Sequence, residues 1–260
     1  MIDLHAHPLP GLDDGPPTLD AALELARAAA DAGTRTMVAT PHIDHRHGVE
    51  PDAVAGAVAA LAGHLAEAGI PLELRAGGEV SLAMLEEAGP AALQPVRLGG
   101  GPWLLIDTPL EPTVPDFVSR VFRFLAAGER IALAHPERSP ALRDDLGGLS
   151  RLVDAGAITV MSAGSLTGLF GSTAQRATGP LLEAGLVHAL ASDAHSAGRR
   201  PPAIGAAVAP ALGQHPGLEA WLPWLTEDLP AAVVAGTPLP APPATPIARR
   251  RGLGRLLRRR

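Results

Sequence analysis

The sequence predicts one large α/β domain built on a parallel sheet, which we expect to close into a distorted barrel of seven β–α units. Short apolar segments alternate seven times with longer amphipathic segments, a rhythm typical of parallel strands connected by helices. The short segments are apolar on both faces, as strands covered on both sides are. The 260 residues, 47% of them apolar, suffice for one large core. An open doubly wound sheet is the alternative, because periodicity does not separate it from a closed barrel.

The predicted strands and helices follow one another in regular order. Strands are predicted at residues 2–5, 36–39, 72–76, 103–107, 131–134, 158–162 and 187–191. Helices are predicted near residues 18–32, 50–68, 81–88, 114–128, 140–156, 173–185 and 203–213. Thr18 suits the N-cap of the first helix and Gly33 its end. Glycines end three later helices, at Gly69, Gly128 and Gly185.

The residues that are missing exclude several classes of protein. Without Cys, the chain has no disulfide, no thiolate zinc site and no cysteine nucleophile, so it is not a cysteine phosphatase. No apolar run approaches the roughly 18 residues that a membrane helix needs. The N-terminus lacks the basic and apolar regions of a signal peptide. We therefore expect a cytoplasmic protein.

The formal net charge of −6 hides an uneven distribution. Seven Arg stand in residues 249–260, which leaves the rest of the chain with a formal charge of about −13. A Pro-rich stretch separates the two parts. We predict a catalytic domain over residues 1–236, a poorly packed linker over 237–248 and a disordered Arg-rich tail over 249–260. The tail could contact an anionic membrane, whereas the acidic body argues against a nucleic-acid partner.

Ionisable residues gather at the ends of the predicted strands or just after them. They are His5, His7, Asp13 or Asp14, His42, Glu79, Asp107, His135, Asp193 and His195. In a parallel barrel the carboxyl ends of the strands share one rim, where active sites form. We therefore expect these side chains, which are far apart in the sequence, to converge into one pocket.

The chemistry of this set points to divalent metal ions. Four carboxylates brought together would repel one another unless cations neutralised them. Mixed imidazole and carboxylate ligands suit manganese, iron or zinc rather than calcium. Nine donors are too many for one ion, so we expect two or three, most simply Mn²⁺. Three dications would also leave surplus positive charge for a phosphate group.

Several positions leave alternatives open. Glu79 is preferred over Glu73 because two glycines precede it at the strand end. Asp13 and Asp14 are adjacent, and one of them could ligate while the other forms a turn with Gly15. We expect no direct ligation by the remaining histidines, which are His45, His47, His64, His188 and His215.

Four motifs resemble the PHP (polymerase and histidinol phosphatase) superfamily, and within it the bacterial PHP-type tyrosine-protein phosphatases of capsule and exopolysaccharide operons. They are residues 1–15 (MIDLHAHPLPGLDDG), 39–42 (ATPH), 135–138 (HPER) and 192–195 (SDAH), the last followed by Arg200. The resemblance extends from residue 1 to about residue 235 and implies a distorted (β/α)7 barrel of the PHP type. It implies two or three metal ions, often manganese, with iron or zinc as alternatives.

The resemblance also implies an activity and roles for single residues. The expected reaction is hydrolysis of phosphotyrosine on the tail of a membrane-linked tyrosine autokinase that controls polysaccharide export. All nine residues above are implied as metal ligands, with Asp14 favoured over Asp13. Arg138 and Arg200 are implied to hold the phosphate, and Arg199 is a rival to Arg200.

Two positions and the basic tail depart from the family pattern, and three other functions compete. Asp107 stands where the family usually has Glu, and Ser196 stands where it usually has Asn. The shorter side chain of Asp107 puts the number of metal ions in question. The alternatives are another PHP phosphoesterase acting on histidinol phosphate or nucleotides, a nuclease or polymerase-associated module, and a non-catalytic protein with a degenerate site.

Overall fold

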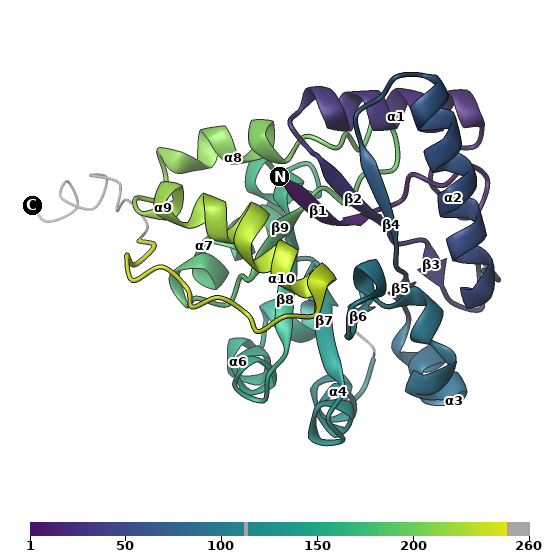
Figure 1. The fold of residues 1–260 in the computed structure, drawn as a ribbon. Helices are drawn as coiled ribbons and strands as arrows, with labels where there is room; N and C mark the ends of the chain where they lie inside the picture. Colours follow the sequence, from purple (N-terminus) through teal and green to yellow (C-terminus); the bar gives the residue numbers. More distant parts are fainter. Residues whose placement is uncertain (112–113, 249–260) are drawn as a thin grey trace, which may run out of the picture.

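The computed structural model describes residues 1–111 and 114–248. Within these residues, parallel strands form two sheets (Figure 1). The smaller sheet has the order β1 (Ile2–Ala6), β2 (Thr36–Ala39), β4 (Glu73–Ala76). The larger has the order β3 (His42–Ile43), β5 (Glu79–Val80), β6 (Trp103–Ile106), β7 (Arg130–Ala134), β8 (Ile158–Ser162), β9 (Ala189–Ala191).

The chain itself connects the two sheets. β2 continues into β3 after Thr40 and Pro41, and β4 continues into β5 after Gly77 and Gly78. Pro41 has no N–H to offer a ladder, which accounts for one of the two breaks. The second and third predicted strands are therefore each followed by a further short strand that begins at a predicted site residue, His42 in β3 and Glu79 in β5.

β1 and the segment after β9 are also hydrogen-bonded. The N–H of His7 donates to the carbonyl of Ala194 at 2.8 Å, and the N–H of Asp193 donates to the carbonyl of His5 at 2.8 Å. These bonds form one isolated parallel bridge, between Ala6 and Ala194, rather than a continuous ladder. The α/β class with parallel strands is confirmed, but the ladders of the described strands do not form a closed barrel, so the distorted (β/α)7 barrel stays an interpretation.

Helices surround the strands (Figure 1). They are α1 (Leu19–Asp31), α2 (Pro51–Glu67), α3 (Leu82–Ala92), α4 (Phe117–Ala126), α5 (Pro140–Arg143), α6 (Leu146–Asp154), α7 (Ser172–Glu183), α8 (Ile204–Leu212), α9 (Leu218–Pro223) and α10 (Leu229–Ala235). Thr18 caps α1 as predicted, because its side chain accepts the N–H of Ala21. Among the described helices, none has both the length and the apolar character that crossing a bilayer requires.

Some predicted helix boundaries are wrong. The single helix predicted over residues 140–156 is divided into α5 and α6, because the Asp145 carboxylate accepts the N–H of Gly148 and starts a new helix. The helix predicted from residue 114 begins at Phe117, after Asp116 in a left-handed conformation. α9 and α10 were not predicted at all.

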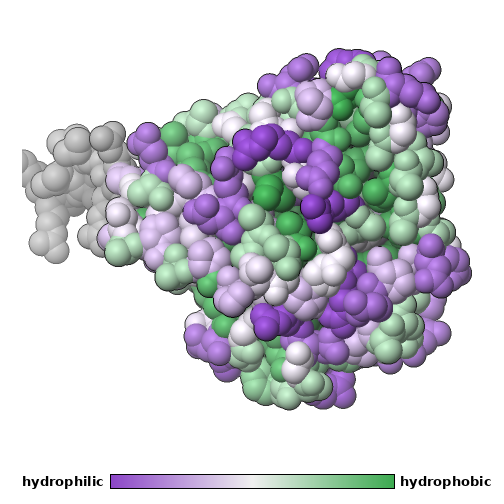
Figure 2. All heavy atoms as spheres, in the orientation of Figure 1, coloured by the Kyte–Doolittle hydropathy of each residue, from purple (hydrophilic) through white to green (hydrophobic). Residues whose placement is uncertain are grey.

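The core lies among the strands and the inner faces of the helices. Every residue of β6 and β8 is buried, which confirms that strands of the larger sheet are covered on both faces. On the face drawn in Figure 2, hydrophobic residues lie intermixed with hydrophilic ones. Scattered apolar side chains of this kind are normal on a folded protein.

The segment over residues 237–248 has no helix or strand, yet it packs on the body. Nε1 of Trp221 donates to the carbonyl of Thr245 at 2.6 Å, and Nε1 of Trp224 donates to the carbonyl of Pro240 at 3.1 Å. Ile247 is buried. These contacts anchor the segment at three points, whereas most of its side chains are exposed, so the linker stays a prediction.

The domain boundary at residue 236 stays a prediction. The Arg-rich tail, residues 249–260, lies outside the described residues. Its predicted disorder and its predicted contact with anionic membranes are therefore left as predictions.

Candidate metal centre

All nine side chains predicted to ligate metal ions lie in one cluster at the carboxyl ends of the strands. His5 is on β1 and His7 directly follows it, while His42 and Glu79 begin the short strands β3 and β5. Asp14 lies in the loop after β1. Asp107 follows β6, His135 follows β7, and Asp193 and His195 follow β9. The convergence expected from the barrel hypothesis is thus present in the described structure.

Glu79 lies at the centre of the cluster and is buried. Its Oε2 is 3.3 Å from Nε2 of His5 and 3.4 Å from Nε2 of His7. The same oxygen is 3.1 Å from Nδ1 of His42, and Oε1 is 2.8 Å from Nε2 of His135. Burial opposes its charge, but the surrounding imidazoles hold the pKa of Glu79 well below its ordinary value. One carboxylate therefore faces four imidazoles and is suited to bridge neighbouring ions.

Asp193 forms a second anionic centre. Its Oδ1 is 3.7 Å from Nε2 of both His5 and His7. Nη2 of Arg200 lies 2.6 Å from Oδ1, and Nη1 of Arg138 pairs with Oδ2. Burial opposes the charged form, but these cations and imidazoles lower the pKa of Asp193. The two arginines therefore meet at one buried carboxylate on the edge of the cluster.

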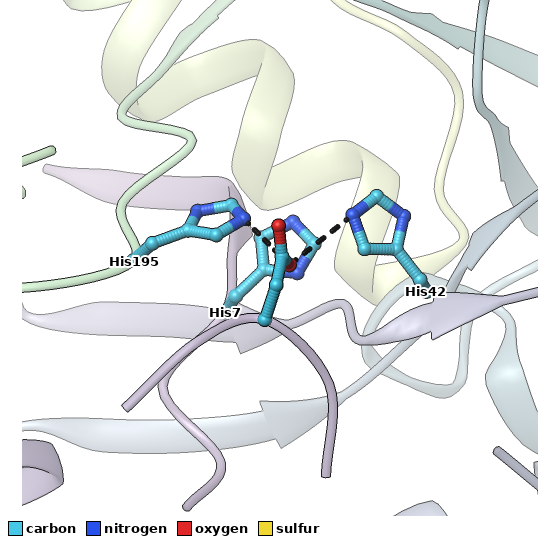
Figure 3. A group of neighbouring side chains, drawn as sticks. His7, His42 and His195 are labelled. Atoms are coloured by element: carbon cyan, nitrogen blue, oxygen red, sulfur yellow. Dashed lines mark ion pairs between the residues drawn. The ribbon is translucent and has the colours of Figure 1, made fainter. Parts of the chain in front are cut away.

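Asp14 lies at the mouth, with its side chain half exposed. Its Oδ1 is 3.1 Å from Nε2 of His195 and 3.5 Å from Nε2 of His42. Figure 3 shows the imidazoles of His42 and His195 approaching from opposite sides, with His7 between them, and marks the ion pairs with dashed lines. Hydrogen bonds to His195 and His42 lower the pKa of Asp14.

Asp107 occupies the far side of the cluster. Its Oδ1 is 3.5 Å from Nε2 of His135. Burial, and then the charge of Glu79, raise the pKa of Asp107 to about 8. A carboxyl group in this position loses its proton readily only if a cation takes the place of the proton. The distance to His135 shows that the short side chain of Asp107 still reaches the cluster.

The donors fit metal ions in overlapping groups. Donor atoms that lie within 4.8 Å of one another belong to His7, Asp14, His42 and His195 in the first group, and to His5, His7 and Asp193 in the second. Two further groups contain Glu79, one with His5 and His135 and the other with His42 and Asp107. Ligand bonds of about 2.0–2.2 Å place donors of one ion at such separations. His5, His7, His42 and Glu79 each belong to more than one of these groups.

The backbone is strained at two of these positions. His135 has a φ of 34° and Asp193 a φ of 53°, in the left-handed region that non-glycine residues rarely adopt. Strained residues persist where the surrounding structure holds them, and they concentrate at functional sites.

Asp13 is a functional contact that the sequence did not assign. Nδ1 of His7 donates to Oδ2 of Asp13 at 2.6 Å, and the N–H of His42 donates to the same oxygen at 3.1 Å. Burial opposes a charge on His7, but hydrogen bonds to Asp13 and Glu79 outweigh it and raise the pKa of His7 to about 10. The predicted turn is also present, because the N–H of Gly15 donates to Oδ1 of Asp13. Asp13 thus orients two candidate ligands.

Ser196 and Glu137 also support the site from outside the donor set. The hydroxyl oxygen of Ser196 accepts the N–H groups of Arg199 and Arg200, which shapes the turn that presents Arg200. Glu137 is buried and accepts the N–H of Ser162. Burial raises the pKa of Glu137 to about 7. The position of Glu137 two residues after His135 was the only feature of the sequence that pointed to this residue.

The residues weighed against these candidates lie elsewhere or at the margin. Glu73 is exposed and pairs with Arg75. His45 pairs with Glu87 in solvent. His47 stacks on His42, with ring centroids 4.7 Å apart, and with Asp44 forms a further group at the edge of the centre. The other histidines that we expected not to ligate, His64, His188 and His215, belong to none of the described donor groups.

Known proteins resemble this chain over most of its length. The model of the family described as capsular polysaccharide synthesis, CpsB/CapC, matches residues 1–216. The tyrosine-protein phosphatase YwqE of Bacillus subtilis is 38% identical over 200 residues, which cover 75% of this chain and 78% of the relative. The putative tyrosine-protein phosphatase CapC of Staphylococcus aureus is 30% identical over 203 residues, 77% of this chain and 79% of the relative.

A solved structure supports the same relationship. It comes from the crystal structures of YwqE from Bacillus subtilis and CpsB from Streptococcus pneumoniae, described as unique metal-dependent tyrosine phosphatases. The match has a TM-score of 0.83 and 31% identity, and it covers 96% of this chain and 100% of the solved one. The chain therefore belongs to the CpsB/CapC family of capsular polysaccharide synthesis.

Proposed function

We propose that this chain is a metal-dependent phosphatase that removes phosphate from tyrosine side chains of proteins. The observation that carries this proposal is the cluster of nine nitrogen and oxygen donors with Arg138 and Arg200 at its edge. The names of the relatives support the same reaction. We further propose that the scaffold is an incompletely closed seven-stranded barrel of the PHP type.

The donor set suits two or three divalent ions, with Mn²⁺ proposed first and iron or zinc as alternatives. The proposed ligands are the nine clustered residues, with Glu79 as the bridging carboxylate. Bound dications would supply a hydroxide nucleophile at neutral pH and neutralise charge on the phosphate. No thiol is needed for this chemistry, which agrees with the absence of Cys.

Arg138 and Arg200 bind the phosphate oxygens in this proposal. Guanidinium groups form paired, charge-assisted hydrogen bonds with phosphate. Both arginines already pair with the carboxylate of Asp193. The oxygens of a phosphate entering between them would take over as acceptors of their hydrogen bonds. The tyrosine phenolate, with a pKa of about 10, leaves more easily than a serine alkoxide.

We propose that the natural substrate is the phosphotyrosine tail of a membrane-linked tyrosine autokinase, on the cytoplasmic side of the membrane. The family's link to capsular polysaccharide synthesis supports this partner. The half-exposed side chain of Asp14 agrees with a protein segment as substrate rather than an enclosed metabolite.

The test compares substrates and metal states of the purified protein. We expect hydrolysis of a phosphotyrosine peptide, its loss after exhaustive chelation and its recovery on addition of Mn²⁺. Histidinol phosphate is the control substrate for the alternative PHP phosphoesterase. Activity that survives chelation, or faster turnover of histidinol phosphate than of the peptide, would contradict the proposal.

A further inference from the structure

A cavity of about 490 Å³ opens directly beside the candidate metal centre. Asp14 and His195 of the centre line one end of it, together with Arg200. Pro17, Leu169 and Phe170 line another part, which we call the apolar wall. The cavity thus joins candidate metal ligands and a proposed phosphate-binding arginine to an apolar surface.

The apolar wall is built on an ordered turn. The turn connects the 3₁₀ helix Ala163–Thr167 to α7, and Gly168 and Gly171 adopt φ values of 83° and 90° within it. The N–H of Leu169 donates to the carbonyl of Gly164 at 3.0 Å. A Cβ on Gly164 would lie 2.7 Å from Leu169 and 3.1 Å from Phe170, so the close approach of both side chains depends on this glycine.

Leu169 is an exposed apolar residue in this wall. Its relative exposure is 45%, while Phe170 beside it is half-buried. Exposing a large apolar side chain to water forgoes the free energy that its burial would give. At the edge of a pocket with converging charged groups, such a side chain is typical of a ligand-binding surface.

Phe170 also connects the wall to the arginines. Cζ of Arg138 lies 4.3 Å from the centroid of the phenyl ring, and Cζ of Arg200 lies 5.4 Å from it. A cation–π contact restrains a guanidinium group without using its N–H donors, so the donors that do not pair with Asp193 remain available for phosphate. A phosphate held by these arginines therefore has an aromatic and aliphatic surface next to it.

We propose that this cavity is the subsite for the aryl group of the substrate, in which the phenyl ring of phosphotyrosine contacts Leu169 and Phe170. This inference rests on the proposed function and adds the source of its preference for aryl phosphates. Contact with the wall removes apolar surface of the ring from water, and ring pairs gain further stabilisation from edge-to-face packing. The short side chain of a phosphoserine would not reach this surface.

The experiment measures binding of two phosphonates to the Mn²⁺-loaded protein by isothermal titration calorimetry. Phenylphosphonate and methylphosphonate carry the same charged group, are not hydrolysed and differ in the ring. The variants are Leu169→Ala, which tests the wall at a side chain without an arginine contact of its own, and Phe170→Ala. Leu110→Ala is the matched control, because Leu110 is an exposed leucine, with 51% relative exposure, that does not line this cavity.

We expect the unchanged protein to bind phenylphosphonate about tenfold more tightly than methylphosphonate. Each wall variant should weaken phenylphosphonate about fivefold and leave methylphosphonate within about twofold, whereas Leu110→Ala should change neither. Absence of a phenyl preference, or equal weakening of both ligands in the wall variants, would overturn the subsite. A phenyl preference in a protein that does not hydrolyse phosphotyrosine would uphold the subsite and contradict the proposed function.

Discussion

Asp13 controls the orientation of His7 by a short hydrogen bond. The Nδ1 of the imidazole donates to the Asp13 carboxylate, so Nε2 is left to face Glu79 and Asp193. Carboxylates that hold a ligating histidine in this way fix its tautomer and raise its basicity. Asp13 is therefore expected to affect metal affinity without touching the ion.

The variant Asp13→Asn tests this role. An amide keeps the shape but loses the charge, so we expect Mn²⁺ affinity to fall about 10- to 100-fold, with activity partly restored by excess Mn²⁺. Metal affinity is read by calorimetry and metal content by elemental analysis. Asp31→Asn, at an exposed position at the end of α1, is the control and should bind Mn²⁺ as the unchanged protein does. Equal affinities in both variants would rule out the orienting role.

At single positions, the sequence predicts chemistry better than it predicts contacts. His42 and Glu79 could be assigned to the cluster because each follows a strand-like segment. The residue pattern alone did not separate Asp13 from Asp14, because adjacent residues have the same place in the pattern and differ only in the direction of their side chains, and only the family resemblance favoured Asp14. Phe170 carried no signal, since its contacts with two arginines arise from elements far apart in the chain.

Among the elements, the break between β4 and β5 decides where Glu79 lies. A Cβ on Gly77 would lie 2.7 Å from Val38, and one on Gly78 would lie 2.8 Å from Ile43. Both neighbours belong to the adjacent strands β2 and β3, so the backbone passes too close for any side chain. The two glycines therefore allow the chain to pass close to β2 and β3 before β5 begins with the central carboxylate.

We expect Gly78→Ala to destabilise the fold by about 1–3 kcal/mol and to lower Mn²⁺ affinity, because the added methyl must push β5 away from Ile43. The matched control is Gly63→Ala on α2, where an added Cβ meets open space and should stabilise the helix by about 0.5–1 kcal/mol. Urea denaturation measures both free energies of unfolding. A stable Gly78→Ala variant with unchanged metal affinity would contradict the close packing.

His188 links β8 to β9 in its neutral form. Its Nδ1 accepts the N–H of Thr159 at 3.3 Å, and burial lowers the pKa of His188 to about 4. Between pH 6.5 and 4 the unfolded chain therefore binds a proton at this residue that the folded chain does not, so its contribution to stability is lost as the pH falls through this window.

The variant His188→Asn keeps an acceptor but does not titrate. At pH 7 the unchanged protein should be the more stable of the two, and the difference should shrink by roughly 2 kcal/mol as the pH falls to 4.5. Urea denaturation at several pH values measures the two free energies. A difference that stays constant with pH would show that His188 does not titrate as the structure requires.

Regular elements could be predicted from the sequence, but short and strained ones could not. β2 and β8 have the predicted bounds, because apolar runs of four or five residues between turn signals define a buried strand. β3 and β5 have two residues each, which is too short for any period. The positive φ of His135 and Asp193 depends on tertiary contacts and has no local signal.

For the molecule as a whole, the segment over residues 237–248 is anchored to the body, although most of its side chains are exposed. Ile247 is buried, and both Trp221 and Trp224 donate their ring N–H to backbone carbonyls of this segment. The Pro-rich composition suggested a linker. Composition indicates how stiff a segment is, but it does not show the surface onto which the segment packs.

Two truncations separate this segment from the Arg-rich tail. Removal of residues 237–260 should lower the free energy of unfolding by about 2 kcal/mol, because it exposes apolar surface and removes the two indole hydrogen bonds. Removal of residues 249–260 alone is the control and should leave stability and phosphatase activity unchanged. Equal unfolding midpoints for both truncations would contradict the structural role of the segment.

The most direct test of the whole account is anomalous diffraction at the manganese edge from crystals of Mn²⁺-loaded protein. Two or three strong peaks are expected among the clustered donors, each about 2.0–2.2 Å from imidazole nitrogens and carboxylate oxygens. A map without a peak between His5, His7 and Asp193 would contradict the proposed metal centre.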